Sequence, residues 1–154
     1  MAFPGKSLGT RHNEHLPIIN PNLCISKISN MTKIFMSLAA LFGGLSVAAG
    51  AFASHALKEK LSERALEIFE VGARYQMYHA LALLLVAILL IQTESPPTSL
   101  IVSGWLFIIG IFIFSGSLYA LSLSDIKILG AITPLGGVAF IIGWGALAFA
   151  AFSY

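Results

Sequence analysis

Four long apolar stretches are the feature that most constrains how this chain can fold. They cover residues 34–53, 75–91, 100–121 and 128–152, and no Asp, Glu, Lys or Arg interrupts them. A helix needs about 20 mostly apolar residues to cross the hydrocarbon core of a bilayer. Only 10% of the residues are charged, whereas a typical soluble domain carries about 25%. The pattern predicts an all-α fold with four transmembrane helices.

The connections between these stretches are short, which predicts how the helices are arranged. Pro96 and Pro97 lie between the second and third stretches and stop a helix there. Residues 122–127 join the third stretch to the fourth. Connections of this length force neighbouring helices to run antiparallel. A chain of 154 residues allows one domain. We therefore expect residues 31–154 to form a single membrane domain, a four-helix transmembrane bundle.

The first 30 residues differ from the rest of the chain. They hold three of the six prolines and no long apolar run, so a disordered N-terminal extension is expected. Their few basic residues show no clear amphipathic period, which makes a transit peptide a poor fit. Met31 is followed by Thr-Lys and an apolar run, which is typical of the start of a membrane protein. Two hypotheses stay open, translation from Met1 and translation from Met31.

The first apolar stretch also shares features with a cleavable signal peptide. Lys33 precedes it, and Ala51-Phe52-Ala53 matches the small-residue pattern of a cleavage site. However, the apolar run of about 20 residues is longer than the core of about 7–15 residues found in signal peptides. We expect an uncleaved transmembrane helix, with cleavage after Ala53 as the alternative.

The segment 55–74 is the most highly charged part of the chain and holds half of its charged residues. Its apolar and charged residues fall on different faces at helical spacing, and Ser62 is a suitable N-cap. An amphipathic helix lying in the membrane interface is therefore expected between the first and second spans. The alternative is a solvated helix that makes no lipid contact.

The distribution of Lys and Arg predicts the orientation of the bundle. Four of them lie in the segment 55–74, and Lys127 lies in the last connection on the same side. If translation begins at Met31, the opposite side holds only Lys33. The excess then places the charged connection in the cytoplasm and both termini outside. The basic residues within positions 1–30 would nearly cancel this bias if that segment is present.

Small residues recur at regular spacing in three of the four spans, which favours close packing of transmembrane helices. The positions are Ser46, Gly50 and Ser54 in the first span, Ser103, Gly110 and Ser117 in the third, and Gly130, Gly136, Gly137 and Gly143 in the fourth. The spacing is four in the first span and seven in the third and fourth, and a spacing of seven keeps one seam turned towards a partner helix. The same seams would serve a homo-oligomer or a contact with another membrane protein. A glycine-lined pore is the alternative.

Several polar residues and one proline are candidates for a functional or structural role. They are His55, Arg74, Tyr75, Gln76, His79, Ser115, Ser117, Tyr119, Thr133 and Pro134. Ionisable groups at membrane depth are costly, so His79 is a functional candidate by default. Pro134 cannot donate a backbone hydrogen bond and is expected to kink the fourth helix. The Thr133 hydroxyl could then bind a freed carbonyl group.

Other functional classes find no support in the sequence. Cys24 is the only cysteine, and the histidines after Met31 lack the H-x-x-x-H spacing of a metal site. There is no nucleophile elbow, phosphate loop or pair of intramembrane carboxylates. The net charge of +2 is too small to indicate a nucleic-acid partner. We therefore expect no enzyme activity, no cofactor and no bound metal, with the lipid bilayer as the main partner.

Four local strings together resemble one known family. They are GAFASHAL (50–57), YQMYHAL (75–81), FSGSLY (114–119) and TPLGG (133–137), the last followed by Gly143-Trp144. In this order and spacing they resemble the DUF423 family, also called UPF0382, and its relatives in the transmembrane protein 256 group. The resemblance covers residues 31–152, and Ser54 departs from it slightly. It implies a multi-pass protein of the bacterial inner membrane, and it implies no reaction, ligand or catalytic residue.

The sequence thus favours a non-enzymatic accessory or scaffold protein. The alternative is a small-molecule or ion permease that uses the Pro134 kink, with His55, Gln76 and His79 facing a crevice. A haem or metal carrier built on His55 and His79 is a third hypothesis.

Overall fold

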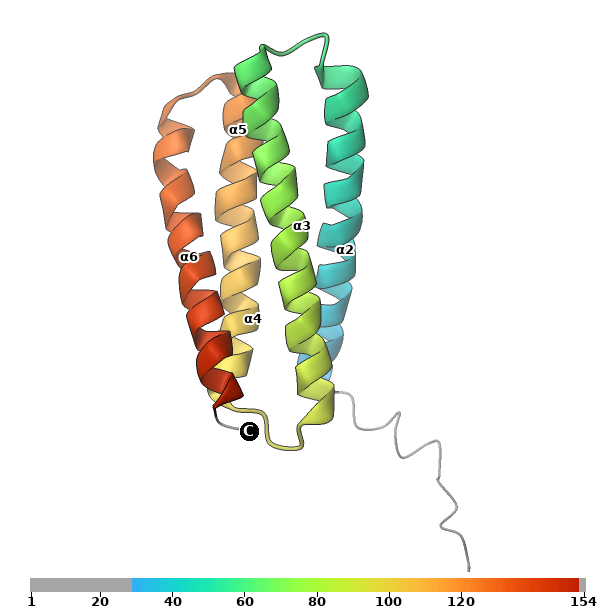
Figure 1. The fold of residues 1–154 in the computed structure, drawn as a ribbon, viewed down its shortest axis with the longest axis vertical. Coiled ribbons are helices and arrows are strands. Elements are labelled where there is room, and N and C mark those ends of the chain that lie inside the picture. The colour runs from blue at the N-terminus through green and yellow to red at the C-terminus, as the bar shows by residue number, and fades with distance from the viewer. Residues whose placement is uncertain (1–28, 153–154) are drawn as a thin grey trace, which may run out of the picture.

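The computed structural model describes residues 29–152, which form helices joined by short turns (Figure 1). In chain order the elements are α2 (Asn30–Phe52), the π-helical turn η1 (Ala53–Leu57), α3 (Glu63–Gln92), α4 (Thr98–Gly110), the π-helical turn η2 (Ile111–Ser115), α5 (Gly116–Ser124) and α6 (Ile128–Ala151). The N-terminal extension expected over residues 1–30 lies outside the described residues except at its end. There, Ser29 is the N-cap of α2, and its hydroxyl accepts a hydrogen bond from the backbone N–H of Thr32.

Four continuous helical segments are long and apolar enough to cross a membrane. They are Asn30–Leu57, Glu63–Gln92, Thr98–Ser124 and Ile128–Ala151. The shortest has 24 residues, and a helix of that length is roughly 36 Å long, against about 30 Å for the hydrocarbon core. Successive segments run in opposite directions (Figure 1). The predicted all-α fold with four membrane-spanning helices is confirmed.

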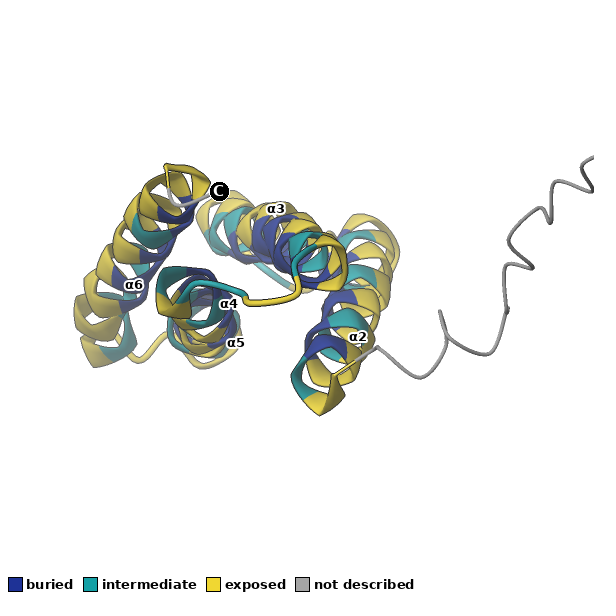
Figure 2. Ribbon diagram, turned by 90° about the horizontal axis from the view of Figure 1, so that it is seen from below, coloured by how far each residue is buried: buried dark blue, intermediate teal, exposed yellow. Residues whose placement is uncertain are grey.

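The helices pack mainly on their neighbours in the chain. Helix α2 packs on α3, and α3 also packs on α4, η2 and α5, while α6 packs on those same three elements. Viewed along the bundle, the buried residues face the interior and the exposed ones face outwards (Figure 2). Many of the exposed side chains are large and apolar, among them Val47, Phe112 and Ile141. An apolar outer surface of this kind fits contact with lipid chains.

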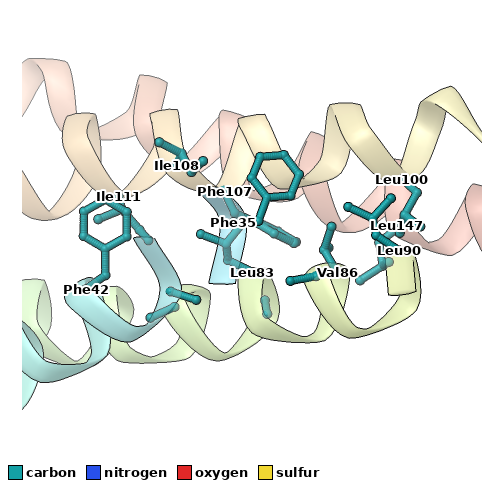
Figure 3. Packing of buried hydrophobic residues seen from close by; sticks show 14 of the residues in the cluster. Phe35, Phe42, Leu83, Val86, Leu90, Leu100, Phe107, Ile108, Ile111 and Leu147 are labelled. Carbon is teal, nitrogen blue, oxygen red and sulfur yellow. The ribbon is translucent and has the colours of Figure 1, made fainter. Parts of the chain in front are cut away.

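Two clusters of apolar residues form the interior. The larger one joins all four spans, and its fully buried members include Phe35 from α2, Leu83 and Val86 from α3, and Phe107 from α4 (Figure 3). The smaller one lies where the first span turns into the second, and it consists of Ala53, Leu57 and Phe69. These contacts hold η1 against the first turns of α3.

The separate interfacial helix expected over residues 55–74 is not confirmed. Residues 55–57 belong to η1, and a short turn follows. Helix α3 then runs without interruption from Glu63 to Gln92 and includes the second span. Ser62 caps this helix, as the sequence predicted, and its hydroxyl accepts from the N–H of Ala65 at 3.2 Å. No proline separates the charged turns from the apolar ones. The predicted apolar face therefore packs inside the bundle, where Phe69 and Gly72 are buried.

Candidate functional site

Gln76 lies where three of the four spans meet. It is on the inner face of α3 and only 5% exposed. Its Nε2 donates to the backbone oxygen of Phe42 in α2 at 2.9 Å. Its Oε1 accepts from the hydroxyl of Tyr119 in α5 at 3.0 Å. Both ends of the carboxamide are therefore engaged, and they connect α2, α3 and α5.

His79 lies about one helical turn further along α3 and is equally buried. Its Nδ1 is 2.8 Å from the backbone oxygen of Tyr75, and its Nε2 accepts from the indole N–H of Trp144 at 3.3 Å. A carbonyl group can only accept a hydrogen bond, and an indole N–H can only donate one. The two contacts together require a neutral imidazole that carries its proton on Nδ1.

Aromatic rings enclose the His79 imidazole. The ring of Phe140 in α6 is stacked on it, with centroids 3.4 Å apart and planes 6° from parallel. Phe107 in α4 lies 5.7 Å away and also contacts Trp144, at 5.2 Å. The imidazole thus fills the space between α3, α4 and α6 instead of facing solvent.

Tyr119 reaches Gln76 because α3 leaves room for its ring. A Cβ atom added at Gly72 would lie 3.1 Å from the Tyr119 ring, closer than side chains normally approach. The ring also packs against Phe69, with centroids 4.7 Å apart. Gly72 therefore has a local role that its place in the sequence did not reveal.

Hydroxyl groups make further links between the spans. The Ser117 and Thr133 hydroxyls are 2.8 Å apart and join α5 to α6. Ser46 in α2 donates to the backbone oxygen of Ala73 in α3. Thr133 also donates to the backbone oxygen of Leu129 at 3.3 Å. Because Pro134 has no N–H, the carbonyl of Gly130 lacks its helical donor. The Thr133 hydroxyl binds the carbonyl one residue earlier, at Leu129.

Several sequence-predicted residues lie away from this cluster. His55 is exposed in η1, and Arg74 is exposed on the outer side of α3. Tyr75 is partly exposed as well, but its ring is stacked on His79, with centroids 6.1 Å apart, and lies 4.9 Å from the ring of Phe114. Pro134 is exposed on α6, which continues as helix on both sides of it. The structure therefore brings Gln76 and His79 to one buried face, while His55 and Pro134 lie at the surface.

Two of the predicted serines are buried without a hydrogen-bond partner in the described part of the chain. They are Ser103 in α4 and Ser115 at the end of η2, each at most 1% exposed. Ser115 is four residues before Tyr119, so the two share one face of the third span. Among the buried hydroxyls without a partner in the described residues, Ser115 is thus the one closest in sequence to Tyr119.

Aromatic rings or main-chain atoms of other helices pack directly against several glycines of the third and fourth spans. An added Cβ would overlap the ring of Phe140 at Gly110, and the backbone of Phe114 at Gly136. At Gly143 it would come within 2.9 Å of the Phe107 ring. Contacts at the other two predicted glycines of α6 are looser, at 3.4 Å for Gly130 and 3.8 Å for Gly137.

The small residues at the end of the first span do not meet another helix of the chain. A Cβ added at Gly50 would find no atom within 4 Å. Ser54 is exposed and donates to the backbone oxygen of Gly50 at 3.0 Å. Of the three positions in the predicted seam, only Ser46 is buried between helices.

Sequence reasoning missed two features that shape the cluster. Trp144 was not among the candidates, although an indole N–H in a membrane span needs an acceptor. Gly104 was also missed, and a Cβ there would overlap the ring of Phe35. The spacing of small residues shows which positions allow close approach, but it does not show which aromatic ring fills each one.

Comparison with known proteins gives the family. The model for a protein family described as "Protein of unknown function (DUF423)" matches residues 49–137, more than half of the chain. The chain belongs to the DUF423 family. The match to DUF423 includes Gln76, His79 and Tyr119, and it ends at Gly137, seven residues before Trp144.

Curated DUF423 relatives extend the similarity. "UPF0382 membrane protein YwdK" of Bacillus subtilis is 48% identical over 122 residues, which is 79% of this chain and 98% of that protein. A UPF0382 membrane protein of Staphylococcus epidermidis is 47% identical over 124 residues, with the same coverage. One from Staphylococcus saprophyticus is 49% identical over 114 residues, or 73% and 91% of the two chains. No solved structure matches the chain.

Within residues 29–152, no group of three or more His, Cys, Asp or Glu side chains is placed to hold a metal ion. The histidines of the third hypothesis are also separated, since His55 is exposed and His79 is buried. The chain is a multi-pass membrane protein of the DUF423 family whose buried polar groups connect its spans.

Proposed function

We propose that this protein is a non-enzymatic accessory or scaffold protein of the bacterial inner membrane. One observation carries the proposal. Gln76 and His79, the polar side chains buried at the centre of the second span, use both amide ends and both ring nitrogens within the chain. A residue that binds a substrate or moves a proton must have a free position directed at it. These two side chains instead stabilise the contacts between helices.

The proposed location is supported by the type of span. Helices satisfy their backbone hydrogen bonds internally, which suits the cytoplasmic membrane, whereas proteins of the bacterial outer membrane are typically closed barrels of strands. The curated relatives are named membrane proteins without further detail.

A partner for the groove between the end of the first span and α3 is part of the proposal. Gly50 and Ser54 do not take part in packing within the chain, yet small residues at this spacing allow close approach of a transmembrane helix. A second copy of the chain or another membrane protein could use this position.

Native mass spectrometry of the full chain, gently extracted from its own membrane, tests the proposal. We expect an assembly of fixed stoichiometry, either a homo-oligomer or a complex with one other membrane protein. Gly50→Leu should disrupt it while the chain stays folded, because a Cβ at this position finds no atom within 4 Å and the side chain enters an open groove. Gly145→Leu is the matched control, since Gly145 is equally open but lies on α6. A bare monomer that carries only lipid would contradict the proposal.

A permease is the second candidate, and one observation favours it. The buried hydroxyls of Ser103 and Ser115 lack partners in the described part of the chain, and an internal path for a polar solute would need such groups. Reconstitution into liposomes with a panel of ions and metabolites tests it. A flux that Ser103→Ala and Ser115→Ala abolish would favour the permease over the scaffold. Absence of flux for every solute would remove this candidate.

A further inference from the structure

The start of α3 and the connection from α5 to α6 lie at the same end of the bundle (Figure 1). Residues of these two segments line a cleft. Its volume is about 300 Å³, and the polar residues that line it are Ser62, Arg64, Ser122, Asp125 and Lys127. Ser122 donates to the backbone oxygen of Ala65 at 2.7 Å, which fixes the end of α5 against the first turn of α3. This bond joins the two helices that form the walls of the cleft.

Two cationic side chains from distant parts of the sequence line this cleft. Arg64 belongs to the first turn of α3, and Lys127 immediately precedes α6. Both are exposed, and neither forms an ion pair with any residue between positions 29 and 152. Asp125 is the single carboxylate among the lining residues, and it is not paired with either cation there. The lining keeps a net charge of +1, which is complementary to a singly charged anion.

The backbone adds to the positive character of the cleft. Lys127 is the N-cap of α6, and no side chain caps the first turn of that helix. The N-terminal end of a helix carries partial positive charge. The Ser62 hydroxyl accepts from the N–H of Ala65, which leaves its own proton free to donate.

Exposed apolar side chains beside the cleft indicate where the anion comes from. Ile126 and Ile128 flank Lys127 in the sequence and are 53% and 70% exposed, and Leu123 is 56% exposed. Large apolar side chains next to a lysine are typical of a segment at the membrane interface, where the ammonium group stays in the headgroup layer. This arrangement fits a cleft at headgroup depth, with its apolar flank towards the acyl chains.

We propose that this cleft binds the phosphodiester headgroup of an anionic phospholipid. Arg64 and Lys127 contact the phosphate oxygens, and the Ser62 hydroxyl donates to the same group. Asp125 faces the polar part of the headgroup and accepts from its hydroxyl groups, which fits phosphatidylglycerol. The acyl chains lie against Ile126 and Ile128. This site does not depend on the scaffold role proposed above.

Native mass spectrometry of the purified full chain in detergent tests the site. The protein is titrated with phosphatidylglycerol, phosphatidylethanolamine and phosphatidylcholine that carry identical acyl chains. We expect one tightly held phosphatidylglycerol, preferred about tenfold over the other two lipids, in line with the attraction of basic side chains to anionic lipid. Equal retention of all three lipids, or a preference for phosphatidylethanolamine, would overturn the proposal.

Charge-matched variants separate the cleft from the general charge of this end of the bundle. The double variant R64Q/K127Q should lose the preference, and R64K/K127R should keep it. K58Q/K60Q is the control, because it removes two positive charges from the same end without touching the cleft. An equal loss in the control, or an unchanged preference in R64Q/K127Q, would contradict the site. Circular dichroism checks that each variant is folded. If R64Q/K127Q does not fold, the single variant K127Q replaces it and should lose part of the preference.

A soluble anion is the other source of the same chemistry. Inorganic phosphate should not displace the bound lipid, because it makes no contact with the apolar flank. Ile126→Ser combined with Ile128→Ser should weaken lipid retention. Complete displacement by inorganic phosphate, together with unchanged retention in the isoleucine variant, would assign the cleft to a soluble anion and overturn the lipid proposal.

Discussion

At the scale of single residues, Gln76 shows how this bundle uses polar side chains inside the membrane. A carboxamide in hydrocarbon costs several kcal/mol when its hydrogen bonds are not made. Gln76 makes one bond to the backbone of α2 and one to Tyr119. Each bond joins two spans, so the cost of burying the group is offset by contacts that also fix how the helices are positioned.

Tyr119→Phe should destabilise the protein by about 0.6 kcal/mol and by no more than about 1.7 kcal/mol, the range measured for hydrogen bonds between transmembrane helices. The variant keeps the aromatic ring packed against Gly72 and removes the hydroxyl that donates to Gln76. The free energy of unfolding in mixed micelles measures the effect. Tyr78→Phe is the control, since Tyr78 is 57% exposed. A loss of the same size in both variants would contradict the assigned role.

The His79 contacts predict a fixed tautomer. In the wild type, imidazole nitrogen shifts measured by NMR at neutral pH should show the proton on Nδ1, because Trp144 donates to Nε2. Trp144→Phe retains an aromatic ring but removes that donor. The Tyr75 carbonyl still holds the proton on Nδ1, so the tautomer should be kept, while the Nε2 shift should move to that of a nitrogen without a hydrogen bond. Trp105→Phe, which alters a tryptophan packed on Phe35 instead, should leave the shifts unchanged. A proton on Nε2 in the wild type would refute this arrangement.

At the scale of helices, glycines determine where the third and fourth spans approach each other. Backbone approaches backbone at Gly136, where an added Cβ would overlap the main chain of Phe114 within η2. A π-helical turn changes the direction of the residues that follow it by inserting one extra residue. Here it separates α4, whose Phe107 contacts Gly143, from α5, whose Ser117 contacts Thr133.

Gly136→Ala should destabilise the bundle by about 1–3 kcal/mol, the usual cost of inserting a group into a packed interior. The added Cβ would overlap the main chain of Phe114, which cannot move aside as a side-chain end can. Gly145→Ala on the same helix should be neutral or slightly stabilising, because no atom lies within 4 Å and alanine favours helix. Thermal unfolding in detergent compares the two. Equal melting temperatures would be inconsistent with the close contact.

At the scale of the whole molecule, charge is distributed unevenly between the two ends of the bundle. Within the described residues, Lys58, Lys60, Arg64, Arg74 and Lys127 lie towards one end, and Lys33 lies at the other. The excess of basic residues predicts that the first end faces the cytoplasm. The cleft proposed to bind anionic lipid lies at this same end.

Labelling of single cysteines with a membrane-impermeant maleimide tests the orientation. In a Cys24→Ser background, Ser95→Cys should react in intact cells, because the second connection lies at the opposite end from the charged one. Lys60→Cys should react only after the membrane is permeabilised. The reverse pattern would show that the bundle has the opposite orientation. Labelling of both positions from one side would contradict the antiparallel arrangement itself.

The sequence by itself determined the number of spans, their approximate limits and the N-cap of α3. These follow from local properties, since the length of an apolar run and the hydrogen bond of a capping serine depend on neighbouring residues alone. The same local pattern suggested a separate helix over residues 55–74. It could not show that the helix continues into the second span, because the amphipathic period is the same in both cases.

Only the tertiary structure decided which faces meet. Gln76 and His79 are recognisable as costly polar groups from the sequence, but their partners, the Phe42 carbonyl, Tyr119 and Trp144, lie in three other spans. A repeat of small residues likewise shows where close approach is possible and not which helix comes close. Gly50 and Gly136 both belong to predicted seams of small residues, yet one is open and the other meets backbone. The difference depends on how the helices are rotated about their axes, which packing of all four spans together determines.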